Sequence, residues 1–235
     1  MPRTMFVWTC IVIVTVILGA MAFITFPFDR RGHVIHRYAR WWGWLILKAN
    51  GVRVKVQGTE YLDDRRPCIY VCNHQGSFDI FSLLAYLRVP FRWLAKAELF
   101  KIPILGWAMR TAGYISLDRS AKKKAYQSME LAARKIKEGT SVVIFPEGSR
   151  SLDGALQPFM NGGFTLAIKA GVPVCPVAIA GSWQIMPRTT LRIKKGNIGI
   201  IISEPIETKG LTMQDRRPLM QQAEDRIRKA LSHAV

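Results

Sequence analysis

The distribution of apolar and polar residues divides the chain into two parts. Residues 5–27 form an apolar run without a charged residue, and a helix needs about 20 such residues to cross a bilayer. Residues 33–50, HVIHRYARWWGWLILKAN, mix basic and aromatic residues, which is typical of a helix at the level of lipid headgroups. From residue 51 onward, short β-branched runs alternate with longer helical patterns, and this alternation predicts an α/β domain.

The α/β part is expected to form a mixed, largely parallel sheet flanked by helices. Strands are predicted at residues 52–57, 68–72, 91–95, 113–117, 141–145 and 174–179, with a hairpin that pairs 191–193 with 198–202. Helices are predicted at residues 78–87, 98–111, 121–138, 163–170 and 214–232. The expected domains are therefore residues 1–50, a membrane anchor with an interfacial helix, and residues 51–235.

The apolar run is interpreted as an uncleaved anchor. It ends in Phe26 and Pro27, whereas the apolar region of a signal peptide is about 7 to 15 residues long and ends in small residues. Five arginines and lysines follow within residues 30–48, and only Arg3 precedes the run, so the bulk of the chain is expected on the cytoplasmic face of the inner or plasma membrane. A shallow, re-entrant anchor and a core-packed helix at residues 33–50 are the alternatives.

The charge balance indicates anionic partners. Lysine and arginine number 34 against 16 acidic residues, a formal net charge of +18, which suits phospholipid surfaces, phosphorylated substrates or acidic carrier proteins. Nucleic acid is excluded as a partner because no nucleic-acid-binding module is recognisable. The four cysteines lack metal-site spacing, so free thiols are expected and neither a zinc site nor a disulfide framework.

Candidate chemistry lies where the second predicted strand ends, in the segment NHQGSFD at residues 73–79. On a continuous helix, His74 and Asp79 would point about 140° apart, so a loop is required if the two are to meet. Gly76 permits the turn, Ser77 is a suitable N-cap, and Asp79 in the first helical turn can reach back to the imidazole. The alternative is a capping aspartate beside an unrelated histidine.

Three further segments follow at strand ends or near them: GYISLDR at 113–119, FPEGSRS at 145–151 and VPVCPV at 172–177. Together with NHQGSFD they resemble, in the same order, the motifs of the glycerolipid acyltransferase family, and of the 1-acylglycerol-3-phosphate acyltransferases in particular. Lys96 in KAEL, and Pro103 and Gly106 in PILG, also match the family. VPVCPV is equally well interpreted as a structural bend before a buried strand.

The resemblance implies roles for individual residues. His74 and Asp79 are the expected catalytic pair, in which the histidine takes a proton from the substrate hydroxyl. Substrate binding is expected from Lys96, Arg119, Glu147, Gly148, Ser149 and Arg150. Arg119 would bind the substrate phosphate, unless it is a surface arginine paired with Asp118, and Glu147 would accept hydrogen bonds from glycerol hydroxyls or orient Arg150.

The implied reaction transfers an acyl group from acyl-CoA or an acyl carrier protein to 1-acyl-sn-glycerol 3-phosphate and gives phosphatidate. The resemblance implies no metal and no organic cofactor, membrane lipids as partners, and no particular oligomeric state. One departure bears on the acceptor: Met160 and Asn161 stand where many relatives have a lysine-bearing segment. The alternatives are acylation of glycerol 3-phosphate, another lysophospholipid or an amino-acid lipid, and a basic lipid-binding protein without catalytic activity.

Overall fold

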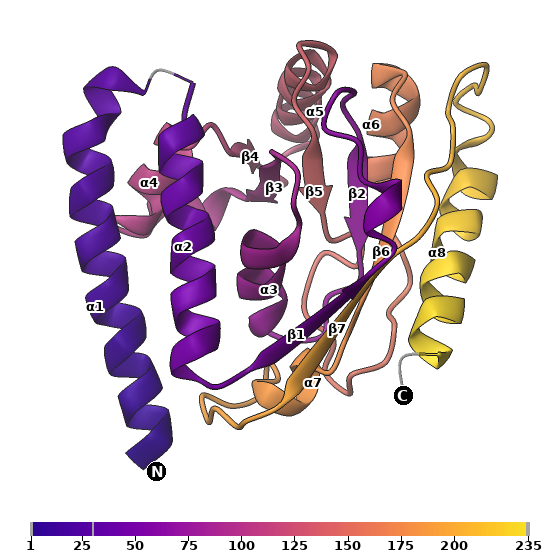
Figure 1. Ribbon diagram of the computed structural model, residues 1–235. Helices are drawn as coiled ribbons and strands as arrows, with labels where there is room; N and C mark the ends of the chain where they lie inside the picture. Colours follow the sequence, from indigo (N-terminus) through magenta and orange to yellow (C-terminus); the bar gives the residue numbers. More distant parts are fainter. Residues whose placement is uncertain (1, 30, 234–235) are drawn as a thin grey trace.

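The computed structural model describes residues 2–29 and 31–233 and contains a seven-stranded sheet covered by helices on both faces (Figure 1). The helices are α1 (Pro2–Thr25), α2 (His33–Ala49), α3 (Phe78–Tyr86), α4 (Leu105–Thr111), α5 (Lys122–Lys137), α6 (Gly162–Ala170), α7 (Ser182–Ile185) and α8 (Arg216–Ser232). The strands are β1 (Arg53–Gln57), β2 (Ile69–Cys72), β3 (Arg92–Lys96), β4 (Ile115–Leu117), β5 (Val142–Ile144), β6 (Val174–Ala180) and β7 (Asn197–Ile202). Short 3-10 helices η1 (Phe26–Phe28), η2 (Thr59–Tyr61) and η3 (Ala97–Lys101) complete the chain.

The sheet has the strand order β1-β7-β6-β2-β5-β3-β4. Neighbouring strands run parallel, except for the antiparallel pair β6–β7. This arrangement confirms the predicted mixed, largely parallel α/β architecture. Because β2, β5, β3 and β4 are parallel neighbours, the loops that follow them emerge at one edge of the sheet, where open α/β sheets bind ligands.

Both faces of the central strand β2 are buried, as the uninterrupted apolar sequence of β2 predicts. Ile69 and Val71 belong to the core on the side of α5, α6 and α8, where Phe164 is fully buried. Tyr70 and Cys72 belong to the core on the side of α2 and α3. Successive side chains of β2 therefore pack into apolar layers on opposite faces of the sheet.

The predicted N-terminal helices are confirmed as α1 and α2, which lie side by side, with α2 packed on α3 (Figure 1). Near the start of α1, Arg3 Nη2 donates to Asn50 Oδ1 over 2.8 Å and Trp8 Nε1 donates to the Leu191 carbonyl over 3.1 Å. Near its other end, Phe23 contacts the Trp107 ring of α4 with centroids 5.5 Å apart. The helix is thus attached to the α/β unit towards both ends.

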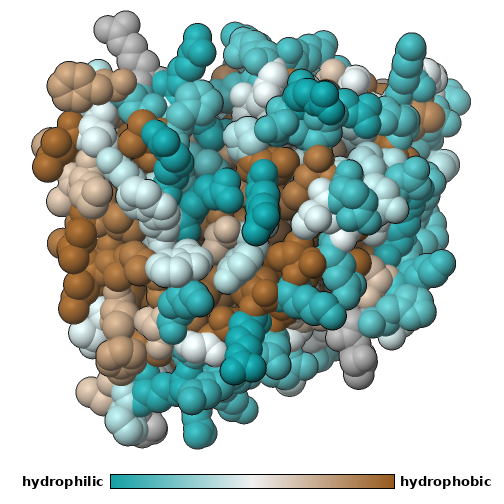
Figure 2. Space-filling view, viewed as in Figure 1, coloured by the Kyte–Doolittle hydropathy of each residue, from teal (hydrophilic) through white to brown (hydrophobic). Residues whose placement is uncertain are grey.

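Residues 2–28 are long and apolar enough to cross a membrane, by length and composition. The outward face of α1 carries apolar side chains, seen as the brown edge in Figure 2. Eight of these side chains are more than half exposed: Met5, Phe6, Val12, Ile13, Val16, Ile17, Phe23 and Ile24. The segment is therefore a candidate membrane anchor, while the division of the chain at residue 50 stays a prediction.

Two predicted elements are wrong. The hairpin between residues 191–193 and 198–202 is absent, because Leu191 and Ile193 hydrogen-bond to α1 through Trp8 and Thr4, whereas β7 pairs with β1 and β6. The helix predicted at 98–111 is divided into η3 and α4. Pro103 lies at the break, and proline is disfavoured inside a helix because it lacks the N–H and clashes with the preceding turn.

Candidate active site

The predicted pair of His74 and Asp79 is brought together by the loop after β2. His74 Nδ1 lies 2.8 Å from Asp79 Oδ2. The carboxylate is fully buried, and the histidine side chain is 12 % exposed and lines the main cavity. With Nδ1–H donating to Asp79, the neutral imidazole presents its lone pair at Nε2. Nε2 has no hydrogen-bond partner among residues 2–29 and 31–233, so it can accept a proton from a ligand.

Asp79 also fixes the shape of the loop that carries the histidine. Its Oδ2 atom accepts from the backbone N–H groups of Gln75 at 2.8 Å and Gly76 at 2.9 Å. The expected side-chain cap from Ser77 is not formed; the Ser77 hydroxyl instead accepts a hydrogen bond from the Arg150 guanidinium. A single carboxylate oxygen thus orients the imidazole and orders the turn before α3.

Aromatic stacking fixes the plane of the imidazole ring. The Phe145 ring, which follows β5, stacks on His74 with centroids 3.9 Å apart and an interplanar angle of 10°. Trp93 of β3 stacks on Phe145 in turn, with centroids 5.4 Å apart. Stacking on this face restricts rotation of the imidazole ring.

Glu147 stabilises the same loop through hydrogen bonds to backbone N–H groups and does not line the cavity. Its Oε1 accepts from the His74 backbone N–H at 2.7 Å, and its Oε2 accepts from the Gln157 N–H at 3.2 Å. Burial raises the pKa of Glu147 to about 7, although the two N–H groups oppose the shift. Within the described part of the chain, Glu147 does not line the main cavity and forms no hydrogen bond or ion pair with Arg150, so the structure does not bring it to the position expected for binding glycerol hydroxyls.

The remaining predicted site residues line the main cavity, and three of them are basic. Lys96 ends β3, Arg119 follows β4, and Arg150 follows β5 with Gly148 and Ser149. None of these three cations has a carboxylate within 4.0 Å among the described residues. Asp118 pairs instead with Lys124 at 3.6 Å, which rules out the alternative that Arg119 is neutralised by its neighbour. The cavity mouth therefore presents unpaired positive charge.

Gly148 allows Arg119 to approach the loop after β5. Gly148 has a φ of +74°, and a Cβ at this position would lie 3.1 Å from Arg119 Nη1 and 2.2 Å from Met160 Cε. Met160 Sδ accepts from Arg119 Nη1 over 3.7 Å. The methionine that departs from the family pattern thus lies against the cation expected to bind phosphate.

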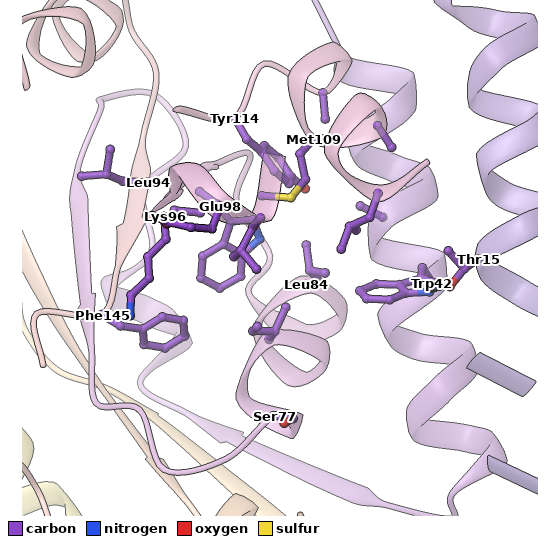
Figure 3. A pocket seen from close by; sticks show the side chains of 18 of the residues that line it. Thr15, Trp42, Ser77, Leu84, Leu94, Lys96, Glu98, Met109, Tyr114 and Phe145 are labelled. Carbon is purple, nitrogen blue, oxygen red and sulfur yellow. Dashed lines mark hydrogen bonds between the residues drawn. The ribbon is translucent and has the colours of Figure 1, made fainter. Parts of the chain in front are cut away.

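The cavity extends from His74 to the N-terminal helices and has a volume of about 870 Å³. In Figure 3, Lys96 and Phe145 lie at one end, Thr15 and Trp42 at the other, with Leu84 among the side chains between them. Trp42 Nε1 donates to Thr15 Oγ1 at 2.9 Å, which satisfies both polar groups at the α1–α2 contact. The chamber is polar and basic at the His74 end and largely apolar beyond it.

Several residues of the site were not identified from the sequence. Phe145 lies inside FPEGSRS, but only the structure reveals its stacking. Asn73 is fully buried and bridges the end of β2 to β6 by exchanging hydrogen bonds of 2.9 and 2.7 Å with Ile179. Arg188 also lines the cavity and lies outside every motif. VPVCPV forms the start of β6, and none of its described residues lines the cavity.

Comparisons with known proteins agree with this geometry. The family model described as acyltransferase matches residues 53–180. A 1-acyl-sn-glycerol-3-phosphate acyltransferase of Pseudomonas aeruginosa is 30% identical over 88% of this chain and 81% of its own length. A chloroplastic 1-acyl-sn-glycerol-3-phosphate acyltransferase of Brassica napus is 35% identical over 84% of this chain. The chain spans 58% of the length of the Brassica protein.

A solved structure is similar over nearly the whole chain. The crystal structure of the 1-acyl-sn-glycerophosphate acyltransferase PlsC from Thermotoga maritima superposes with a TM-score of 0.82 and 26% sequence identity. The similarity covers 97% of this chain and 94% of the Thermotoga chain. The segment matched by the family model includes the loops that follow β2, β3, β4 and β5. The chain belongs to the acyltransferase family, as a glycerolipid acyltransferase similar to the 1-acyl-sn-glycerol-3-phosphate acyltransferases.

Proposed function

We propose that the protein transfers an acyl group from a thioester to the free hydroxyl of 1-acyl-sn-glycerol 3-phosphate and produces phosphatidate. The observation that carries this proposal is the His74–Asp79 pair, with its 2.8 Å contact, beside unpaired cations and at the end of an apolar cavity. A lysophosphatidate offers a hydroxyl, a phosphate and a hydrocarbon chain to these three features. The names of the relatives support the same acceptor.

In the proposed mechanism His74 acts as a general base and then as a general acid. The acceptor oxygen forms a bond to the thioester carbonyl carbon while its proton moves to Nε2. The tetrahedral intermediate then collapses, the C–S bond breaks, and the imidazolium returns the proton to the sulfur. The products are an ester and a thiol. Asp79 stabilises the imidazolium between the two steps, and the stacked Phe145 restricts rotation of its ring.

No protein nucleophile takes part in this scheme, because the hydroxyl that attacks belongs to the substrate. Nor does the transfer need an oxidant, a reductant or a further group carrier. We therefore propose that the enzyme uses no metal or organic cofactor. The donor is a coenzyme A or acyl carrier protein thioester; both carry the same phosphopantetheine arm.

The acceptor phosphate is assigned to Lys96 and Arg119. A guanidinium can bind a phosphate through two parallel hydrogen bonds, and Arg119 has no competing carboxylate within 4.0 Å among the described residues. Arg119→Ala should raise the KM for lysophosphatidate about tenfold or more and leave the KM for the donor nearly unchanged. Arg134→Ala, which removes an exposed arginine of α5 that does not line the cavity, is the matched control. A rise confined to the donor KM would reassign Arg119.

We propose that the face formed by α1 and α2 contacts the membrane. Their exposed side chains include Phe23, Trp41 and Trp44, and this side of the molecule carries the apolar edge in Figure 2. The cavity reaches both helices at Thr15 and Trp42 (Figure 3). Attachment of α1 to the α/β unit towards both ends, through Trp8 and Phe23, supports a shallow placement in one leaflet, with the α/β unit on the cytoplasmic side. An impermeant thiol reagent should then label cysteines introduced at Pro2 and Arg31 from the same side, whereas labelling from opposite sides would support a span.

The proposed function is tested with the purified full chain and a labelled acyl thioester. Lysophosphatidate, glycerol 3-phosphate, lysophosphatidylcholine and a lyso amino-acid lipid are offered separately. Phosphatidate formed from lysophosphatidate with the highest kcat/KM is the expected result. Exclusive acylation of another acceptor would contradict the substrate, and absence of transfer to every acceptor would contradict the enzymatic activity and favour a lipid-binding role.

A further inference from the structure

The cavity contains a fourth cation that belongs to none of the recognised motifs. Arg188 lies in the connection between α7 and β7, and it lines the cavity together with His74, Ser77 and Arg150. The same connection carries Arg192, which is exposed like Arg188 but does not line the cavity. Position in the fold therefore distinguishes Arg188 from the general excess of basic residues on this protein.

The backbone near Arg188 is fixed to the catalytic turn. The Ser77 N–H donates to the Met186 carbonyl at 3.3 Å. Gly76 packs so closely on this connection that a Cβ would lie 2.6 Å from the Ser182 carbonyl oxygen and 3.0 Å from that of Met186. Arg188 is two residues beyond Met186, so its side chain starts from a point held against the turn between His74 and α3.

Arg150 converges on the same turn. Its guanidinium donates to the Ser77 hydroxyl. Burial lowers the pKa of Arg150, and the positive charge of Arg188 lowers it further. Neither arginine has a carboxylate within 4.0 Å among residues 2–29 and 31–233. Two adjacent guanidinium groups repel each other, and an anion placed between them relieves that repulsion.

The sheet order separates Arg188 from the other three cations of the cavity. In the sequence β6-β2-β5-β3-β4, the connection that carries Arg188 leaves from the β6 side. His74 follows β2, while Arg150, Lys96 and Arg119 come from β5, β3 and β4 on the opposite side. Arg150 reaches the turn after β2 through its hydrogen bond to Ser77. The catalytic histidine therefore has cations on both sides. The proposed reaction likewise brings together two phosphate-bearing substrates.

We propose that Arg188, from the β6 side of His74, and Arg150, which reaches the same turn from the β5 side, form a second phosphate-binding subsite beside the one assigned to Lys96 and Arg119. The group recognised is the oxygen face of a phosphate mono- or diester, carried by the thioester donor or by the lysophospholipid acceptor. This inference rests on the proposed function. It assigns a substrate-binding role to Arg188, whose position follows from the fold alone.

The test compares wild type, Arg188→Ala, Arg188→Lys and the matched control Arg192→Ala in steady-state kinetics. The donors are acyl-CoA and an acyl N-acetylcysteamine thioester, which lacks phosphate. Arg188→Ala should raise one KM about tenfold, Arg188→Lys should restore part of the loss, and Arg192→Ala should behave as wild type. A rise for acyl-CoA that is absent with the phosphate-free donor identifies the donor phosphate; a rise for lysophosphatidate with both donors identifies the acceptor.

Changes of less than about twofold in every KM, or an equal effect of Arg192→Ala, would overturn the subsite. Failure of the proposed function would be visible separately, as absence of transfer by the wild type. In that case titration calorimetry with inorganic pyrophosphate decides: Arg188→Ala should weaken binding by about fivefold or more relative to wild type and Arg192→Ala. An unchanged Kd would then overturn the proposal.

Discussion

Replacement of Asp79 by asparagine isolates the charge of the carboxylate from its geometry. Three N–H donors converge on Oδ2, from His74, Gln75 and Gly76, at 2.8 to 2.9 Å. The other oxygen, Oδ1, is buried without a hydrogen-bond partner in the described residues. In Asp79→Asn the amide oxygen should therefore occupy the Oδ2 position and the NH₂ group the Oδ1 position. The loop and the imidazole tautomer should survive the change.

The expected loss is the electrostatic support of the imidazolium. Opposite unit charges about 4 Å apart interact by about 4 kcal/mol at an effective dielectric constant of about 20, which suits a pair that is almost buried. Since about 1.4 kcal/mol corresponds to a factor of ten in rate, full loss of this term gives about 10³-fold. Partial proton transfer in the transition state reduces the figure, so we expect kcat to fall about 10²- to 10³-fold.

The assay is steady-state acyl transfer to lysophosphatidate, with Asp225→Asn, an exposed carboxylate of α8, as the matched control. The KM values should change little, because Asp79 is fully buried. Nitrogen-15 NMR of labelled histidine should report an unchanged Nδ1–H tautomer for His74. A fall in kcat of less than about threefold would show that the charge of Asp79 does not support the imidazolium, and a switch to the Nε2–H tautomer would show that the amide does not keep the carboxylate's geometry.

Two further changes test the support of the loop and the far end of the cavity. Glu147→Gln should lower kcat more than it raises the acceptor KM, because one amide cannot accept from both the His74 and Gln157 N–H groups; the opposite split would return Glu147 to substrate binding. Because burial raises the pKa of Glu147 from 4.5 to about 7, its stabilising contribution is present below pH 4.5 and lost as the pH rises towards 7. The Tm of wild type should therefore fall relative to that of Glu147→Gln across this range, and parallel Tm curves would contradict the assignment. Gly19→Leu should reduce turnover of long-chain more than short-chain substrates, since even a Cβ there would lie 2.7 Å from Ile104 Cγ2; equal effects on all chain lengths would place the acyl chain elsewhere.

The architecture and the catalytic pair were predictable because both depend on local sequence and on a general rule. β-Branched runs and helical periods identify most elements, and parallel strands bring their carboxyl ends to one edge. His74 and Asp79 lie only five positions apart, so a turn at Gly76 suffices to join them. Arg119 and Arg150, far apart in sequence, meet the same cavity because both follow strands of that parallel group.

Other features of the site depend on tertiary packing, which the sequence pattern does not show. Glu147 follows the same strand as Arg150, but only the packing of the loop decides that its carboxylate faces the His74 backbone. Strand β7 pairs with β1 and β6 and not with residues 191–193. The sequence does not show which of these partners β7 prefers. Arg188 gives no signal in the sequence, since nothing local separates it from Arg192.

In the proposed mechanism His74 takes the proton of the acceptor hydroxyl, and His74→Ala removes the group that takes it. The variant is assayed with lysophosphatidate and an acyl thioester, with circular dichroism and pyrophosphate binding as checks that the fold and the cationic mouth persist. The kcat should fall at least about 10²-fold, the contribution typical of a general base, with folding and pyrophosphate binding unchanged. Turnover equal to that of the wild type would show that His74 is not the base.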